Sequence, residues 1–376
     1  MSSLPEYAAP MPRFRFPPVA TMVLCCALAA CATTTSTLPE PPSAESGDGF
    51  ATTLVPESFS TPRDAALALD SIASWVSPEG QPWIVASAKQ ANLLLAFDGD
   101  SGAELARVGA DASLAGPNGV AVFGDLLFVV ERDAGRVSVF SLPDFASVGQ
   151  FGQEWLFQPY GLWLRETAPL ELEAFVTDSY VGAPTALQHN DQRVKRFRVL
   201  LDDPLHAEFL GHFGSTGIEG ALRQVESIAG DEEHGRIVVA DEWRKGESPP
   251  ALRVYGFDGE YRGVDIGAGM FQGEPEGIAL YDCPDGSGYW IAADQHKRKN
   301  RFHVFARQSL EWLGSFGGAS VGDSDGIALR SDSSERFPDG ALYVADAGEA
   351  VVAFDWRNVA DALGLRSGCA APVEGR

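Results

Sequence analysis

The sequence predicts an all-β fold, a six-bladed β-propeller whose blades are antiparallel sheets of four strands. One observation is a short motif that occurs six times along the 376-residue chain, at spacings of 48, 42, 66, 50 and 49 residues. A repeat of about this period is typical of propellers and solenoids. The other observation is composition, because 40 Gly and 24 Pro against four Met favour many short strands and tight turns over long helices.

Each copy of the motif joins a polar residue to a small residue and then to a short apolar run, which we interpret as the first strand of a blade. The copy at residues 273–280 shows the pattern in full as Gly-Glu-Pro-Glu-Gly-Ile-Ala-Leu. The residues at the polar position of the six copies are Asp70, Asn118, Tyr160, Glu226, Glu276 and Asp325. The first strands of a propeller line its central channel, so these side chains are expected to ring one end of that channel.

The remaining strands follow each motif in a regular order. Continuous apolar segments predict second strands that are buried on both faces, at residues 83–87, 126–130, 174–177, 236–240, 289–292 and 341–345. Third strands are expected at 92–97, 136–140, 193–197, 252–255, 301–305 and 351–354, and a fourth strand often ends in Phe-Gly, as at 151–152, 213–214 and 316–317. Residues 50–60 are expected to supply the outer strand of the last blade, and residues 358–365 a surface helix.

The N-terminus has the pattern of a bacterial lipoprotein signal. Arg13 and Arg15 precede an apolar segment at 19–30, which is too short to span a bilayer as a helix and ends in a lipobox-like Leu-Ala-Ala before Cys31. We therefore expect a signal peptide at 1–30, a disordered tether from lipidated Cys31 over 31–50, the propeller at 51–360 and a tail at 361–376. Two acyl chains would anchor the protein stably. The residue after Cys31 is Ala, which indicates an outer-membrane lipoprotein facing the periplasm or the cell surface.

The net charge of −24 and the pI of about 4.5 argue against a nucleic-acid partner, because a phosphate backbone is bound by a basic face. The acidity is explained either by a solvated surface or by a carboxylate-rich site for hard cations. Besides Cys31 and the signal-peptide cysteines, only Cys283 and Cys369 remain. They form either a disulfide or two free thiols, and we expect a monomer.

Three carboxylates of the ring, those of Glu226, Glu276 and Asp325, cannot converge at neutral pH without raised pKa values or a counter-cation. Glu274 and Asp323 each lie two residues before a ring carboxylate and therefore face the same way on a strand. Carboxylate oxygens in this number suit calcium, whereas zinc prefers Cys and His. For any single acidic residue at a strand end, capping of a turn is the alternative explanation.

On these motifs the chain resembles the β-propeller phytases, the alkaline calcium-dependent phytases of bacteria. The resemblance is densest in residues 220–350. It includes residues 225–233 with Glu242 after them, 274–278 with Gln295, 324–327, and 158–161 around Tyr160, together with Lys89 and Arg132 at the ends of second strands.

The resemblance implies a calcium-dependent phosphomonoester hydrolase of phytase type, which acts on calcium phytate or related inositol phosphates through metal-activated water. Several calcium ions would be held by Glu226, Glu242, Glu274, Glu276, Asp323, Asp325 and Asp70. The implied catalytic residues are Glu226, Glu276, Lys89 and Arg132, and the implied substrate-binding residues are Lys89, Arg132, Tyr160 and Gln295.

The chain departs from the family pattern at three positions. Ser71 replaces a calcium-binding Asp, Ser179 replaces a Lys, and Phe157 replaces a His. Two other functions stay open. One is a lactonase-type propeller with a single calcium ion held by Asn118, Glu226 and Asp325. The other is a non-catalytic surface propeller of the NHL-repeat kind, which binds a partner.

Overall fold

The computed structural model describes residues 51–109, 114–179, 187–244, 249–297 and 299–369. The expected signal peptide, Cys31 and its tether lie outside the described residues. No helix in the described part of the chain combines the length and the apolar character needed to cross a membrane.

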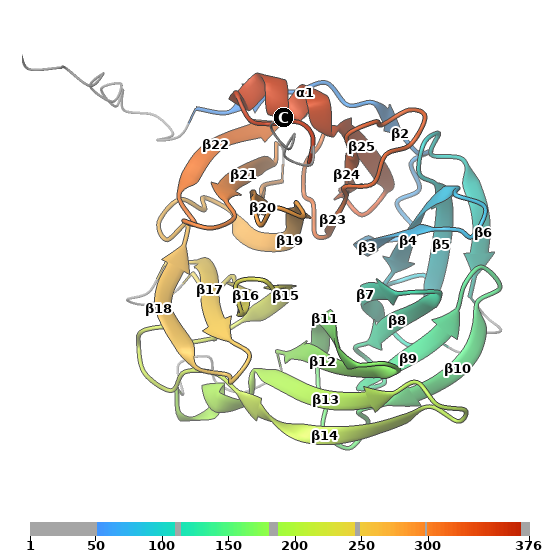
Figure 1. Ribbon diagram of the computed structural model, residues 1–376, viewed down its shortest axis with the longest axis vertical. Coiled ribbons are helices and arrows are strands. Elements are labelled where there is room, and N and C mark those ends of the chain that lie inside the picture. The colour runs from blue at the N-terminus through green and yellow to red at the C-terminus, as the bar shows by residue number, and fades with distance from the viewer. Residues whose placement is uncertain (1–50, 110–113, 180–186, 245–248, 298, 370–376) are drawn as a thin grey trace, which may run out of the picture. The chain divides into compact units, whose positions relative to one another are not determined.

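Six sheets stand side by side in a ring, with the first strand of each sheet innermost (Figure 1). The first three blades are β3–β6 (Leu69–Val76, Pro82–Ala88, Leu93–Asp98, Glu104–Val108), β7–β10 (Pro117–Phe123, Leu126–Glu131, Arg136–Ser141, Ala146–Phe151) and β11–β14 (Pro159–Ala168, Glu171–Asp178, Val194–Leu200, His206–Phe213). The last three are β15–β18 (Val225–Asp231, Arg236–Asp241, Ala251–Gly256, Tyr261–Ile266), β19–β22 (Glu274–Asp282, Gly288–Gln295, Arg301–Ala306, Trp312–Gly317) and β23–β25 (Ile327–Arg330, Ala341–Asp346, Ala350–Asp355). The predicted six-bladed β-propeller of four-stranded antiparallel blades is confirmed.

The N-terminal segment closes the ring. Strand β2 (Phe59–Ser60) pairs antiparallel with β25 and supplies the outer strand of the sixth blade, as the sequence predicts. Strand β1 (Thr53–Leu54) adds a parallel fifth strand to the outer edge of the fifth blade. Because the first and last parts of the propeller share one sheet, the ring has no open seam.

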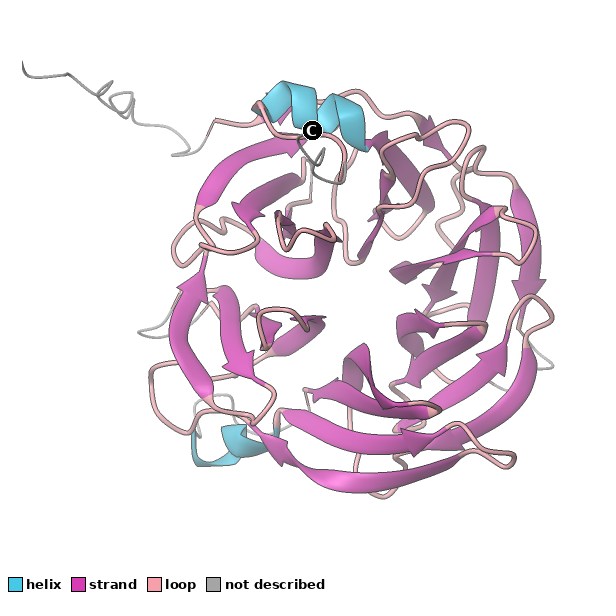
Figure 2. Ribbon diagram, in the orientation of Figure 1, coloured by secondary structure: helices cyan, strands magenta, loops and turns pink. Residues whose placement is uncertain are grey.

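Strands dominate, and the helices are short (Figure 2). The 3₁₀ helix η2 (Leu187–Gln192) precedes β13. Helix α1 (Trp356–Leu363) is capped by Asp355 at its start and by left-handed Gly364 at its end, as is usual for helix termini. Its Trp356 stacks on Tyr281, at 4.6 Å between ring centroids, and a disulfide joins Cys283 to Cys369.

The apolar core is divided among the interfaces between neighbouring blades. For example, Ile84 and Leu95 of the first blade pack with Tyr343 and Val351 of the sixth. Each second strand is buried along most of its length. Burial of this kind fixes the blades around one axis, and so it fixes the inner strand ends that carry the candidate site.

Candidate active site

The repeated motif coincides with an irregularity at the start of the inner strands. In each of the five inner strands β3, β7, β11, β15 and β19, the antiparallel register shifts at the polar residue and the small residue after it. In the sixth blade Asp325 and Gly326 directly precede β23. A bulge re-aims side chains at the end of a ladder and is frequent next to active sites. The motif thus turns one polar side chain per blade toward the axis.

The small residue of the motif lets neighbouring inner strands approach closely. A Cβ atom on Gly161 would lie 2.7 Å from the carbonyl oxygen of Glu226 in the next blade. A Cβ atom on Gly326 would lie 2.5 Å from the carbonyl oxygen of Asp70, to which the Gly326 N–H donates at 2.9 Å. Similar approaches at Gly119 and Gly277 explain why the motif requires a small residue after its polar one.

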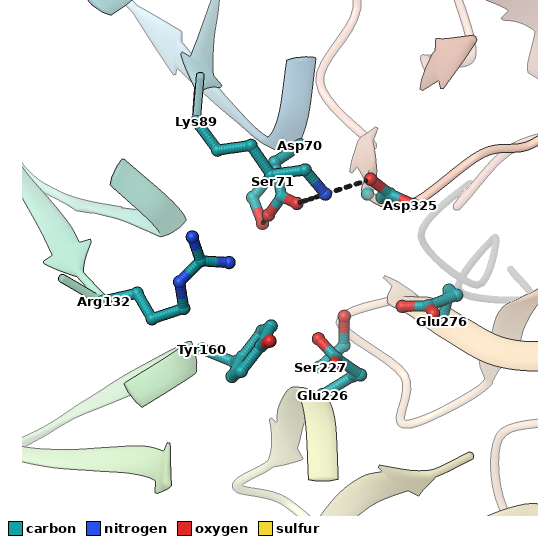
Figure 3. Close-up of a pocket in the computed structure, with 11 residues that line it drawn as sticks. Asp70, Ser71, Lys89, Arg132, Tyr160, Glu226, Ser227, Glu276 and Asp325 are labelled. Carbon is teal, nitrogen blue, oxygen red and sulfur yellow. Dashed lines mark hydrogen bonds and ion pairs between the residues drawn. The ribbon is translucent and has the colours of Figure 1, made fainter. Parts of the chain in front are cut away.

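The polar side chains of five copies line one cavity of about 150 Å³ at the axis. Figure 3 shows Arg132 on the side of the cavity opposite Glu276, and Lys89 close to Asp325. The lining residues are Asp70, Ser71, Lys89, Arg132, Tyr160, Gly161, Glu226, Ser227, Glu276, Asp325 and Gly326. The expectation that the repeated positions converge is thus met at five of them.

A group of glutamates lies at the edge of this cavity. Carboxylate oxygens of Glu242, Glu274 and Glu276 lie within 4.8 Å of one another. Burial, and then the charge of Glu274, raises the pKa of Glu242 to about 7. Burial and the neighbouring carboxylates raise the pKa values of Glu226 and Glu276 well above the ordinary range. Without a cation, this group cannot be fully ionised at neutral pH.

Lys89 neutralises the opposite part of the ring. Its Nζ lies 2.8 Å from Asp70 Oδ1 and 2.8 Å from Asp325 Oδ2. Burial alone would lower the pKa of Lys89, but the two carboxylates raise it above its ordinary value. Burial and the charge of Asp70 raise the pKa of Asp325 to about 6, against the effect of Lys89.

Arg132 and Tyr160 form the cationic and phenolic wall of the cavity. The Arg132 guanidinium lies 5.9 Å from the centre of the Tyr160 ring, and its Nε donates to Asp133 at 2.9 Å. Burial and the charge of Glu226 raise the pKa of Tyr160, so its hydroxyl keeps its proton at neutral pH.

Two predicted residues lie at the border of the site. Gln295 donates through Nε2 to Asp325 Oδ1 and stands opposite Glu274 in the β19–β20 ladder. Asp323 is exposed, has a left-handed backbone with φ of 48°, and does not line the cavity described above. Gln224, which donates to Glu242 Oε1, was not predicted, because an isolated Gln carries no sequence signal.

The acids that end the second strands are structural caps. Asp178 accepts from the N–H groups of Phe157 and Gln158 at 3.1 and 2.8 Å. Asp241 Oδ1 accepts in the same way from the N–H groups of Arg223 and Gln224, just before β15. Asp294 accepts from those of Gln272 and Gly273, just before β19. At these positions the capping explanation holds, since each acid accepts hydrogen bonds from backbone N–H groups that would otherwise be buried without an acceptor.

The family departures have visible consequences. The Ser71 hydroxyl donates to Asp70 Oδ2 at 3.1 Å. The Phe157 side chain is exposed, and the Ser179 N–H donates to the carbonyl of Gln158. The cationic side of the cavity is therefore formed by Lys89 and Arg132.

The glutamates fit calcium. They offer only carboxylate oxygens, which are the ligands that calcium prefers, and they lie close enough to share one ion. A divalent cation would also offset the burial and repulsion that raise their pKa values.

Comparisons with known proteins agree with the propeller fold. A family model described as Phytase matches residues 221–357. A calcium-binding protein, regucalcin, from Agrobacterium tumefaciens superposes with a TM-score of 0.52 and 10% identity, covering 81% of this chain and 97% of that chain. A streptogramin B lyase structure has a TM-score of 0.47 and 11% identity, with 78% and 97% covered. At 10% identity the regucalcin structure shows the fold alone. No curated protein matches the chain.

The matched segment contains every glutamate of the cavity and its edge, together with Asp325. It also coincides with the part of the sequence in which the motifs are densest. Residues 221–357 of this propeller thus match the Phytase family model, as the motifs of the sequence predict.

Proposed function

We propose that this propeller is a calcium-dependent phosphomonoester hydrolase of phytase type, which acts on calcium phytate or related inositol phosphates. The observation that carries the proposal is one cavity that is lined both by carboxylates and by two cations, with Arg132 opposite Glu276 and with Lys89 between Asp70 and Asp325. Such a cavity suits a substrate that is anionic itself and brings, or shares, divalent cations. The match of residues 221–357 to the phytase family supports it.

Calcium would be held by Glu226, Glu242, Glu274 and Glu276. When bound, it supplies positive charge that neutralises these carboxylates and polarises phosphate and water oxygens. The glutamates themselves fix where that charge lies, because Glu226 lies on β15 and Glu274 and Glu276 lie on β19, and these two inner strands of neighbouring blades are in contact.

The cationic wall would hold the phosphate. The Arg132 guanidinium has N–H groups beyond the one that Asp133 accepts, and guanidinium groups suit phosphate oxygens geometrically. The Lys89 ammonium has three hydrogens, of which Asp70 and Asp325 take two, so one is available to a substrate oxygen. The protonated Tyr160 hydroxyl adds a neutral donor beside Arg132.

The test is a comparison of activities in the purified chain. We expect phosphate release from calcium phytate, and loss of that release on chelation. Glu276→Gln should abolish turnover because it removes one buried charge of the calcium site, whereas Glu335→Gln, at an exposed position, should keep it. Full activity in Glu276→Gln rejects the assigned role.

The same assay separates the alternatives. Opening of a sugar lactone without phosphate release would favour the lactonase-type site, which would use Asn118 at the axis. No turnover, combined with a higher melting temperature in calcium, would favour a partner-binding propeller.

A further inference from the structure

The ring of acids is divided into two halves that are neutralised in different ways. In the first half, all four carboxylate oxygens of Asp70 and Asp325 accept hydrogen bonds. The donors are Lys89 Nζ to Asp70 Oδ1 and Asp325 Oδ2, Ser71 Oγ and Asn118 Nδ2 to Asp70 Oδ2, and Gln295 Nε2 to Asp325 Oδ1.

The second half is poor in donors. Among the described residues, Gln224 donates to Glu242, but no N–H or hydroxyl donor reaches the carboxylates of Glu226, Glu274 or Glu276. These glutamates instead approach one another. Acidic groups that lack donors need an outside cation if they are to be ionised together, whereas acidic groups that are saturated with donors do not.

We propose that Lys89 is a built-in counter-cation, whose ammonium holds the place between Asp70 and Asp325 that a calcium ion would otherwise bridge. Calcium would then bind only in the glutamate half of the ring. The inference rests on the calcium-binding part of the proposed function, and it assigns Asp70 and Asp325 to the lysine rather than to the metal.

The geometry makes the two cations mutually exclusive. Lys89 Nζ lies 2.8 Å from an oxygen of each carboxylate, and calcium binds such oxygens at about 2.3–2.6 Å. The ion and the ammonium would therefore occupy the same space. The side chain of Lys89 is 29% exposed, so its remaining hydrogen can still face a substrate.

The family departure at Ser71 acts in the same direction. The position that the resemblance assigns to a metal-binding Asp carries a hydroxyl that donates to Asp70 at 3.1 Å. One acceptor is thus lost, and one donor is gained beside the carboxylate that Lys89 already neutralises. Both changes convert this half of the ring from metal binding to internal hydrogen bonding.

Asn118 shows that an oxygen ligand remains in this half. The side chain is 1% exposed, Nδ2 donates to Asp70 at 3.2 Å, and Oδ1 has no hydrogen-bond partner among the described residues. Removal of Lys89 would therefore leave the Asp70 and Asp325 carboxylates without their shared cation. Their oxygens are ligands of the kind that calcium prefers, and the Asn118 amide lies beside Asp70.

The experiment is to count the calcium ions bound per chain by isothermal titration calorimetry and equilibrium dialysis. Lys89→Met should bind one ion more than the wild type, and Asp70→Asn in the same chain should remove that extra ion. Lys297→Met is the matched control, because it removes an exposed positive charge two residues after Gln295 and should keep the wild-type count. An equal count in wild type and Lys89→Met overturns the inference.

A second variant does not depend on the folding of Lys89→Met. Asp70→Asn alone should keep the wild-type calcium count, whereas loss of one ion would make Asp70 a metal ligand and overturn the inference. Failure of the proposed function can be distinguished from failure of the inference about Lys89. If the wild type binds no calcium, the hydrolase proposal fails, and the role of Lys89 is then decided by whether Lys89→Met gains an ion.

Discussion

Lys89 Nζ and Asp325 Oδ2 lie 2.8 Å apart, although the two residues are 236 positions apart in the chain. Lys89 follows the second strand of the first blade, and Asp325 precedes the inner strand of the sixth. The pair therefore joins the two ends of the ring at the axis, in addition to the strand pairing of β2 with β25 at the rim. The contact that neutralises Asp70 and Asp325 therefore also links the first blade to the sixth.

Lys89→Met is expected to destabilise the calcium-free protein. The substitution leaves Asp70 and Asp325 without their shared cation, and removal of one partner from a partly buried ion pair costs about 2–3 kcal/mol. Urea unfolding in chelator at neutral pH measures the loss. Lys297→Met should change the free energy of unfolding by less than about 0.5 kcal/mol, and an equal loss in both variants would contradict the role of the Lys89 contacts.

The calcium-free protein should lose stability as the pH rises. Folding raises the pKa of Glu242 to about 7 and that of Asp325 to about 6, so between about pH 4.5 and 7 the unfolded chain releases protons that the folded chain retains. The free energy of unfolding therefore falls as pH rises through this range. For a shift as large as that of Glu242, the loss is roughly 3 kcal/mol.

Melting temperatures in chelator at several pH values test this sign. They should be highest near about pH 5, and added calcium should raise them more at about pH 8, because ionised carboxylates bind the ion. Glu276→Gln should flatten the profile, which separates the site from the general repulsion of an acidic chain. A calcium-free melting temperature that rises from about pH 5 to 8 would contradict the prediction.

The ring of polar residues at the inner strand ends could be predicted from the sequence, because the two features that define it are local. The spacing of the motif defines the blades, and a polar residue followed by a small one marks each inner end. The pairing of Lys89 with Asp325 could not be predicted, since it depends on where a flexible four-carbon side chain meets a residue of another blade. For an acid at a strand end, the sequence allows both a capping role and a cation-binding role, and only the backbone donors around Asp178 decide between them.

Gly161→Ala should disturb the site through the backbone. The added methyl group would lie 2.7 Å from the carbonyl oxygen of Glu226, so the third and fourth blades must move apart, at a cost of about 1–3 kcal/mol. We also expect weaker calcium binding, because Glu226 moves with its strand. Gly217→Ala is the control, since its nearest neighbour would be 3.6 Å away. Equal unfolding free energies for the two variants would show that the close approach is unimportant.

Asp178→Ala should cost stability and leave the calcium site intact. The carboxylate accepts from the N–H groups of Phe157 and Gln158, and leaving buried donors unsatisfied costs about 1–3 kcal/mol. Denaturant unfolding measures this loss, and dialysis against calcium should show the wild-type number of bound ions. Loss of an ion would instead assign Asp178 to the metal site.

Cys31→Ser should release the protein from the membrane. We propose that Cys31 carries the lipid anchor of an outer-membrane lipoprotein, because it follows an apolar segment of signal-peptide length and the residues Leu-Ala-Ala. Two acyl chains bind a bilayer stably, whereas an unmodified chain of this net charge has no comparable attraction to it. Fractionation after labelling with a radioactive fatty acid should place the wild type, but not Cys31→Ser, in the labelled outer-membrane fraction. Cys26→Ser, within the segment expected to be removed, should behave as the wild type. An unlabelled wild type, or a Cys31→Ser chain that stays in the membrane, would reject the anchor.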